Sequence, residues 1–308
     1  MTSVAFLFPG QGSQRVGMGS DLLRQEPKLY ERYLKRAEEV AGLPITHMCQ
    51  EGPMDLLTQT EIAQPALFAH SLAVTEYARR QGIHPAYVAG HSLGEYTAAV
   101  AAGALSFEEG LQVVCLRGKL MASIQAEQPG AMGAVQGLSL EKVEALCELS
   151  AHTGTVTIAN INAPLQSVVS GEVAAVEYFL MLARQLGAEK ALRLQVGSAF
   201  HSRFMAPVQT QLAQHLQAVI WYEPEVPLVA NVSGNILRDS ASIRQALIDQ
   251  ITSPVRWVDC MATLSSVGCQ RYLELGSGRV LTGLMKLYTP ETAAFAADSP
   301  RKVVTLKC

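Results

Sequence analysis

The chain has 308 residues, of which 49% are apolar and 17% are charged, and its formal net charge is −3. This length predicts two domains, or one large domain with an insertion, and the composition suffices for a large buried core. A main role in nucleic-acid binding is not expected, because 24 basic against 27 acidic residues leave no excess of cations to displace counterions.

Cysteine usage and apolar runs indicate the compartment. The six cysteines are scattered without a C-x-x-C pair, so we expect neither a disulfide framework nor a metal site, and a reducing, cytoplasmic location fits better. Residues 4–8 are apolar, but no basic segment precedes them and Pro9-Gly10 ends them, which predicts a buried strand and not a signal peptide. The longest apolar stretch, residues 98–105, is too short to span a bilayer, so no membrane association is expected.

The first third of the chain predicts alternating strands and helices. The loop at residues 9–14 carries Gly10-x-Gly12, but Arg15 stands where a dinucleotide-binding fingerprint needs its third glycine. Two interpretations remain for this loop, a tight turn between strand and helix or a loop whose amides face an oxyanion. The predicted elements are a strand at 4–8, a helix at 21–40, an irregular segment at 44–55, a helix at 66–80 and a strand at 87–89.

The segment Gly90-His91-Ser92-Leu93-Gly94 matches the pattern G-x-S-x-G between a predicted strand and a predicted helix. A strand that turns sharply into a helix leaves no room for side chains two residues before and two after the bend. The serine is then exposed on the bend beside the first amides of the helix. We therefore predict that Ser92 is a nucleophile.

Arg117 lies on a predicted helix that Ser106 caps and that runs from 107 to about 124. The helix is apolar almost all round, and its residues one turn from Arg117, such as Met121, are mostly apolar. A guanidinium in such surroundings needs an anion, because a buried unpaired charge is costly. The partner is either a structural carboxylate or the carboxylate of a substrate.

Residues 128–197 predict a separate small unit. The elements follow in the order strand, helix, strand, strand, helix, strand, which is a ferredoxin-like pattern that can be inserted into a larger domain. We therefore expect a large domain made of residues 1–127 and 198–308 and a small domain made of 128–197. The strands are expected at 131–136, 156–162, 167–170 and 190–196, and the helices at 140–150 and 173–186.

The last third returns to alternating helices and strands, which predicts a mostly parallel sheet covered on both faces. His201 follows the small unit on a short polar loop, late in the chain, where the base of a serine site is commonly found. His91, next to Ser92, is expected to be structural or to line the loop. The predicted helices are 205–218, 243–251, one beginning at Ser253-Pro254, and 280–287; the strands are 228–232 and 271–275; the tail from Thr289 is expected to be less regular.

Several motifs follow one another in order along nearly the whole chain. They are Phe8-Pro9-Gly10-Gln11-Gly12-Ser13-Gln14, Gly90-His91-Ser92-Leu93-Gly94-Glu95, Arg117, Asn160-Ile161-Asn162, Ala199-Phe200-His201-Ser202, Thr252-Ser253-Pro254-Val255-Arg256-Trp257, Glu274-Leu275-Gly276 and Val280-Leu281-Thr282-Gly283-Leu284. Together these motifs resemble the malonyl-CoA:acyl carrier protein transacylase family. The resemblance implies a large domain like that of the α/β-hydrolases with the ferredoxin-like small domain inserted.

The resemblance also implies roles for individual residues. Ser92 would attack the thioester of malonyl-CoA with His201 as general base, and the acyl group would pass to the phosphopantetheine thiol of an acyl carrier protein. No other cofactor and no metal is implied. The further implied residues are Gln11 and Leu93, whose amides form an oxyanion hole; Gln250, whose main-chain carbonyl orients His201; Arg117, which binds the malonyl carboxylate; and Met121, Asn160 and Asn162, which line the substrate cleft.

Ala199-Phe200-His201 is similar to the malonyl-selective signature of polyketide acyltransferases, in which Phe200 would fill the space needed by an α-methyl group. Fatty-acid synthesis, polyketide synthesis and a malonate-decarboxylating complex all stay open as pathways. A hydrolase that clears acyl carrier proteins is the rival activity, but its acyl groups would not need Arg117. A non-catalytic docking subunit is a second rival, which would need none of Ser92, His201 and Arg117.

An acidic carrier protein would need a basic docking surface. Three groups of cations are candidates, although each is also typical of an ordinary solvated surface. We expect the protein to be a monomer. The groups are Arg79 with Arg80; Arg32, Lys35 and Arg36; and Lys190 with Arg193.

Overall fold

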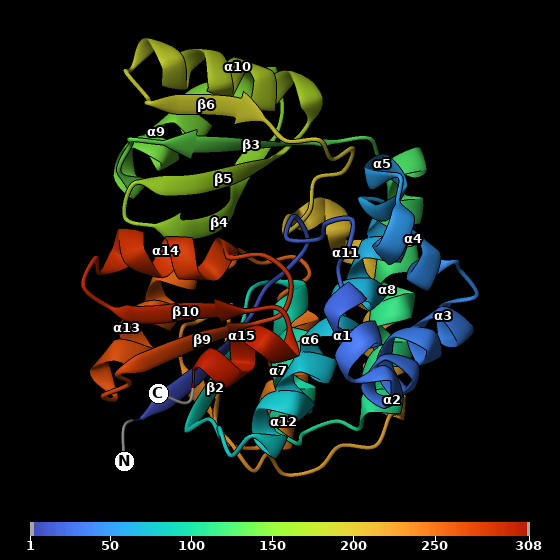
Figure 1. Ribbon diagram of the computed structural model, residues 1–308. Coiled ribbons are helices and arrows are strands. Elements are labelled where there is room, and N and C mark those ends of the chain that lie inside the picture. The colour runs from blue at the N-terminus through green and yellow to red at the C-terminus, as the bar shows by residue number, and fades with distance from the viewer. Residues whose placement is uncertain (1–2, 307–308) are drawn as a thin grey trace.

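The computed structural model describes residues 3–306 and contains two separate β-sheets (Figure 1). The larger sheet has the strand order β10-β9-β1-β2-β7-β8 and is parallel except where β8 pairs with β7. This arrangement confirms the predicted α/β class with a mostly parallel sheet. The strands are β1 (Val4–Phe8), β2 (Tyr87–Gly90), β7 (Leu228–Val229), β8 (Ile236–Leu237), β9 (Arg271–Leu275) and β10 (Ala293–Ala297).

Both faces of this sheet are covered by helices, as the continuous apolar sequence of β1 predicts. Successive side chains of a strand point to opposite faces. Phe6 and Phe8 accordingly pack in one apolar cluster, with residues of α6, α7 and α8, and Ala5 and Leu7 pack in another, with residues of α13 and α14. These helices are α6 (Thr60–Arg80), α7 (Leu93–Ala101), α8 (Phe107–Glu127), α13 (Trp257–Ser266) and α14 (Val280–Tyr288).

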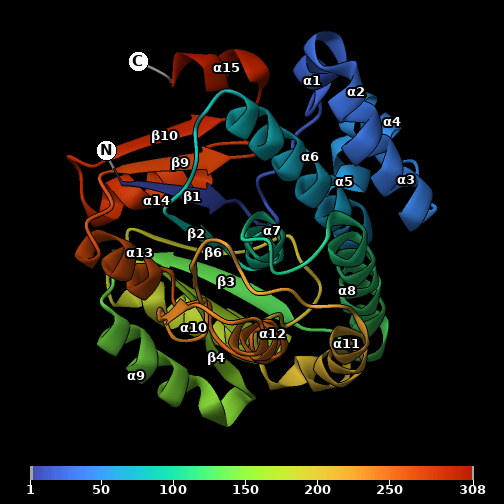
Figure 2. The same ribbon diagram turned by 90° about the horizontal axis from the view of Figure 1, so that it is seen from below.

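The remaining helical elements outside residues 128–197 are α1 (Ser20–Gln25), α2 (Pro27–Tyr30), the π-helix η1 (Glu31–Lys35), α3 (Arg36–Ala41), α4 (Ile45–Glu51), α5 (Met54–Leu57), the 3-10 helix η3 (Arg203–Met205), α11 (Ala206–Ala218), α12 (Ser240–Asp249) and α15 (Pro300–Thr305). Helices α1 to α5 and α8 form a layer beside the sheet, on the right of Figure 1 and of Figure 2. The long helices α6 and α8 pack against each other.

The second sheet is antiparallel, with the strand order β4-β5-β3-β6, and it carries α9 and α10 on one face (Figure 1). The observed element order confirms the predicted succession of strand, helix, strand, strand, helix and strand. The elements are β3 (Ala131–Gln136), α9 (Leu140–Ser150), the 3-10 helix η2 (Ala151–Thr153), β4 (Val156–Ala163), β5 (Gln166–Gly171), α10 (Val173–Gln185) and β6 (Lys190–Arg193).

The second sheet is joined to the segment that precedes α13 by backbone hydrogen bonds. Val255 N donates a hydrogen bond of 2.8 Å to Ala159 O, and Ile161 N donates one of 2.9 Å to Val255 O. The segment around Val255 thus extends the edge of β4 as an isolated parallel bridge opposite Asn160. Helices α13 and α14 also contact β4.

Some local predictions are wrong at their boundaries. The predicted start at Ser253-Pro254 is too early for α13, because the backbone of Val255 pairs with β4 and the helix can begin only at Trp257. Helix α6 begins at Thr60 and contains Pro65. Pro65 has no backbone N–H and so cannot donate one of the helix hydrogen bonds. Packing of α6 against α8 outweighs this loss, because most helix stability comes from tertiary packing.

Other differences concern segments that local patterns describe poorly. The segment 44–55 is not irregular but holds α4 and α5, and the tail holds β10 and α15. The helix predicted at 21–40 is interrupted at Glu26, directly before Pro27. The strands predicted at 190–196 and 228–232 end early, at Arg193 and Val229. Single backbone hydrogen bonds follow each strand, from Leu194 N to Met132 O and from Ala230 N to Asn235 O, but the ladders do not continue.

Candidate active site

Ser92 lies on the sharp turn between β2 and α7, with φ 53° and ψ −110°. This conformation is rare for a residue with a side chain and costs on the order of 1–3 kcal/mol. The turn is also crowded: a Cβ at Gly94 would lie 2.0 Å from Phe8 O, and one at Gly90 would lie 1.9 Å from the carbonyl carbon of Gly94. The two glycines of the G-x-S-x-G pattern are therefore required by packing.

His201 lies opposite Ser92, on the loop that follows the small sheet. Ser92 Oγ is 2.8 Å from His201 Nε2, and His201 Nδ1 is 2.9 Å from the main-chain oxygen of Gln250. Because a carbonyl oxygen can only accept, Nδ1 carries the proton and Nε2 is free to accept the proton of Ser92. His201 is 5% exposed, and burial together with the charge of Arg117 lowers its pKa to about 3. It is thus a neutral base at ordinary pH.

Arg117 reaches the same point from α8 and is 1% exposed. Its Nη2 donates hydrogen bonds of 3.2 Å to Ser92 Oγ and to Gln250 Oε1, and its Nη1 donates one of 2.8 Å to Gln64 Oε1. The guanidinium also lies over the ring of Tyr96, 5.1 Å from the centroid. Within residues 3–306 no carboxylate lies within 4.0 Å of it, so the structural carboxylate considered above is not found.

Two backbone amides beside Ser92 are left available. In the described part of the chain, neither the N–H of Gln11 nor that of Leu93 donates a hydrogen bond, whereas the N–H of Ser92 is occupied by Asn231 Oδ1 at 2.8 Å. The loop that carries Gln11 packs closely on the elbow, since His91 N donates to Phe8 O at 3.0 Å. The loop at residues 9–14 therefore borders the nucleophile and is more than a connection.

Ser92, His201 and Arg117 line a cavity of about 280 Å³. Its apolar wall suits an acyl chain, and its polar groups converge on Ser92. Asn162 does not line it but fixes His91, because its Oδ1 lies 2.8 Å from His91 Nε2. The other lining residues are Gln11, Gly12, Gln14, Thr58, His91, Met121, Met132, Asn160, Leu194, Gln195, Val196 and Phe200.

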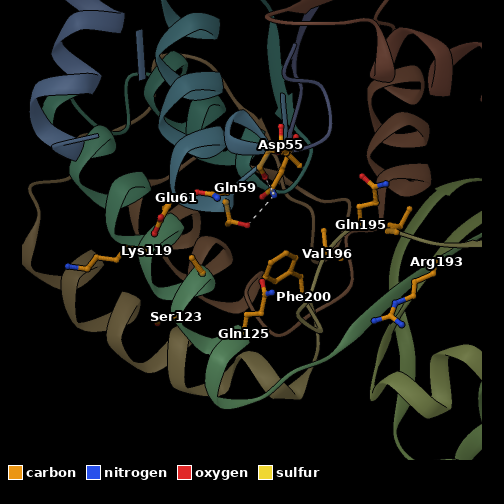
Figure 3. Close-up of a pocket in the computed structure, with 16 residues that line it drawn as sticks. Asp55, Gln59, Glu61, Lys119, Ser123, Gln125, Arg193, Gln195, Val196 and Phe200 are labelled. Atoms are coloured by element: carbon orange, nitrogen blue, oxygen red, sulfur yellow. Dashed lines mark hydrogen bonds between the residues drawn. The ribbon is translucent and has the colours of Figure 1, made fainter. Parts of the chain in front are cut away.

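The cavity adjoins a wider vestibule of about 960 Å³, shown in Figure 3. Gln11, Val196 and Phe200 line both spaces, and Phe200 is only 8% exposed. Lys119 and Arg193 lie on opposite sides of the vestibule, with Phe200 between them (Figure 3). A thioester could thus reach Ser92 with its acyl part in the inner cavity and its longer part in the vestibule.

Several residues that complete the site have no assigned role in the sequence analysis. Gln64 accepts from Arg117, Tyr96 lies under its guanidinium, and Glu95 and Asn231 are buried behind Ser92. The position of Glu95 directly after the G-x-S-x-G pattern is the one sequence feature that could have indicated a role for these residues. Asn231 is 0% exposed, although its Asn-Val-Ser sequence reads as a glycosylation sequon.

Across residues 3–306, no group of three or more His, Cys, Asp and Glu side chains is placed to hold a metal ion. Over the same residues no helix combines the length and the apolar character that crossing a membrane requires.

A serine on a nucleophile elbow, a histidine within hydrogen-bonding distance and two backbone amides beside them are the groups that the formation of an acyl-serine ester requires. Residues 5–276 match the model of the acyl transferase domain, and the chain belongs to this family.

The chain is similar to named relatives over almost its full length. It is 38% identical to the malonyl CoA-acyl carrier protein transacylase of Bacillus subtilis, over 98% of this chain and 96% of the relative. The crystal structure of a malonyl-CoA:acyl carrier protein transacylase from Xanthomonas oryzae matches with a TM-score of 0.94 and 39% identity, over 99% of this chain and 98% of that one. A malonyl-transacylase solved in complex with a type II polyketide synthase acyl-carrier protein matches with a TM-score of 0.94 and 37% identity, over 99% and 98%.

Proposed function

We propose that this protein transfers a malonyl group from coenzyme A to the phosphopantetheine thiol of an acyl carrier protein through an ester on Ser92. The relatives named above carry this activity in their names, over nearly the full length of the chain. The observation that carries the proposal is Arg117, a buried guanidinium that donates to Ser92 Oγ and, among residues 3–306, has no carboxylate partner. A substrate carboxylate supplies the anion that this charge lacks.

The first half of the reaction forms the acyl-serine ester. His201 Nε2 takes the proton of Ser92 while Oγ attacks the thioester carbonyl, and the amides of Gln11 and Leu93 face the oxyanion that develops. When the carbon–sulfur bond breaks, the coenzyme A thiolate leaves and takes from His201 the proton that came from Ser92. The carbonyl oxygen of Gln250 holds the histidine in the required tautomer, in the place where other serine sites use a carboxylate.

In the second half, His201 takes the proton of the carrier's phosphopantetheine thiol, and the thiolate attacks the malonyl ester. The bond to Ser92 breaks and the serine recovers its proton from His201. The protein needs no cofactor of its own for these steps, because coenzyme A enters as a substrate and phosphopantetheine belongs to the partner. Met121, Asn160 and Phe200 line the space in which the malonyl group would lie.

The proposal is tested by the intact mass of the protein after brief exposure to malonyl-CoA, beside the Ser92→Ala variant. A malonyl-sized gain on the parent alone, discharged when phosphopantetheinylated carrier protein is added, is the expected result. A gain only from neutral acyl thioesters, lost slowly to water, would instead establish the hydrolase that clears carrier proteins. The hydrolase is the less favoured reading because it has no use for Arg117.

Four further features belong to the same proposal. We infer that the large part, residues 1–127 and 198–308, is α/β-hydrolase-like and that residues 128–197 form a ferredoxin-like small domain, for which the observed strand order is the support. We also infer a cytoplasmic monomer; the free cysteines at positions 49, 115, 147, 260 and 269 support a reducing compartment. The pathway that the protein serves is tested by comparing carrier proteins from fatty-acid synthesis, polyketide synthesis and malonate decarboxylation in the same mass experiment.

The candidate docking cations differ in how far they are already neutralised. Arg32 and Arg80 pair with Glu76, and Arg36 pairs with Glu108. Lys35 also pairs with Glu31, Arg193 pairs with Glu177, and Arg79 donates to Ala101 O. Within residues 3–306, Lys190 is the member of these groups without a hydrogen-bonded or ionic partner, so it is the most available to an acidic carrier.

A further inference from the structure

Glu95 is a carboxyl group in the first turn of α7 that is 0% exposed. A buried carboxyl is costly unless its oxygens accept hydrogen bonds. Oε1 accepts from Asn231 N at 2.9 Å, and Oε2 accepts a short hydrogen bond from Gln250 Nε2. No cation in the described chain lies within ion-pair distance of it, and the transfer chemistry described above does not use it.

The first partner, Gln250, connects Glu95 to the arginine. Its Nε2 donates to Glu95 Oε2 and, at 2.9 Å, to Ser92 O, while its Oε1 accepts from Arg117 Nη2 at 3.2 Å. An amide that is turned over would place its NH₂ group against the guanidinium and its oxygen against the carboxylate. Glu95, together with the main-chain oxygen of Ser92, therefore determines which end of the amide faces Arg117.

The second partner, Asn231, connects Glu95 to the nucleophile. Its Oδ1 accepts from Ser92 N at 2.8 Å and its Nδ2 donates to Gly90 O at 2.7 Å, so that one amide ties both sides of the strained turn. Asn231 is 0% exposed. The backbone N–H of Asn231 donates a hydrogen bond to Glu95 Oε1.

We propose that Glu95 is a positioning residue that aims Arg117 at the acyl group through the side chain of Gln250, and that Asn231 separately holds Ser92 in its reactive conformation. This inference rests on the proposed malonyl transfer. It assigns different consequences to the two residues. Loss of Glu95 impairs the discrimination between charged and neutral acyl groups, whereas loss of Asn231 impairs the attack on both kinds equally.

The first variant is Glu95→Gln, which has one acceptor oxygen where the parent has two and sets an NH₂ group against one of the two donors. One lost charge-assisted hydrogen bond predicts a fall of about 10–100-fold in kcat/KM for malonyl-CoA. Transfer from acetyl-CoA, which has no carboxylate for Arg117 to bind, is expected to fall by less than about threefold. The ratio of the two constants is the readout, because a general loss of stability lowers both alike.

Asn231→Ala is the second variant, and it is expected to lower malonyl and acetyl transfer by the same factor, so that the ratio stays at the parent value. Glu274→Gln is the matched control. Glu274 is also 0% exposed, and its two oxygens accept from Leu281 N at 3.0 Å and Thr282 N at 2.7 Å, away from the cavity lining. This control is expected to lower thermal stability without changing the ratio.

If Glu95→Gln does not fold, Glu95→Asp keeps a carboxyl group in the core but is one methylene too short to reach Gln250 as the parent does, and the ratio must fall in this variant. A parent that forms the malonyl-serine ester together with an unchanged ratio in the folded Glu95 variant would overturn the inference. A parent that takes no malonyl group would overturn the proposed function instead, so the two failures are distinguishable.

Discussion

Replacing Arg117 with alanine tests the origin of malonyl selectivity. The guanidinium now donates to three neutral oxygens, on Ser92, Gln64 and Gln250, and it is buried beside the apolar wall that includes Met121. A malonyl carboxylate that entered the cavity of the variant would lose its cation without regaining water.

The expected magnitude follows from that burial. Breaking a buried pair by removing one partner costs about 3–5 kcal/mol. At about 1.4 kcal/mol for each tenfold change, kcat/KM for malonyl-CoA should fall by about 10²–10³·⁵. Acetyl transfer loses only the hydrogen bond from Arg117 to Ser92 Oγ, about 1 kcal/mol, and should fall by less than about tenfold.

The assay compares kcat/KM for malonyl-CoA and acetyl-CoA with a phosphopantetheinylated carrier, after circular dichroism has shown that the variant is folded. Arg117→Lys is the matched control, because it keeps the positive charge but not the two parallel N–H donors of the planar guanidinium. Its kcat/KM for malonyl-CoA should lie between the values of the parent and of Arg117→Ala. Equal falls in kcat/KM for the two substrates in Arg117→Ala would refute the idea that Arg117 binds the malonyl carboxylate.

Three further predictions follow from the geometry. Gly94→Ala should fold poorly, because its Cβ would lie 2.0 Å from Phe8 O. Gly283→Ala, at an exposed helix position with open space around it, should instead raise the free energy of unfolding by about 0.5–1 kcal/mol. Urea titration of both variants checks this pair of predictions, and equal effects on the free energy of unfolding would contradict it. Phe200→Ala should raise the methylmalonyl-to-malonyl ratio by about 10–100-fold in competition assays, and no change would show that Phe200 does not exclude the α-methyl group. Burial lowers the pKa of His201 from 6.5 to about 3, so its stabilising contribution is complete above pH 6.5 and is lost as the pH falls toward 3. The resulting slope of the free energy of unfolding, at most about 1.4 kcal/mol per pH unit, should be present in the parent and absent from His201→Gln, and parallel pH curves of unfolding for the two proteins would argue against it.

Sequence patterns identified the parts of the site that depend on local geometry. Gly90 and Gly94 mark the elbow because each lacks room for a Cβ, and that requirement is visible in the sequence. The apolar surroundings of Arg117 predicted a buried charge in need of an anion, but its neutral partner Gln64 comes from another helix and has no local signature.

The sequence could not assign a role to Asn231 or to the side chain of Gln250, because both act through long-range contacts. Asn231 and Gln250 lie 139 and 158 residues from Ser92, and only the folded sheet brings their amides to the turn. Boundaries failed for the same reason. Val255 reads as the start of a helix, yet the free edge of β4 offers it a backbone partner, and such a partner cannot be inferred from neighbouring residues.

The backbone bridge at Val255 has a mechanical consequence. Val255 is bonded to β4 of the small sheet, and five residues earlier in the chain the carbonyl of Gln250 holds His201. His201 itself follows the segment that returns from β6. The base is thus tethered to the small sheet from two directions, so the position of the proton acceptor is coupled through the backbone to the position of that sheet.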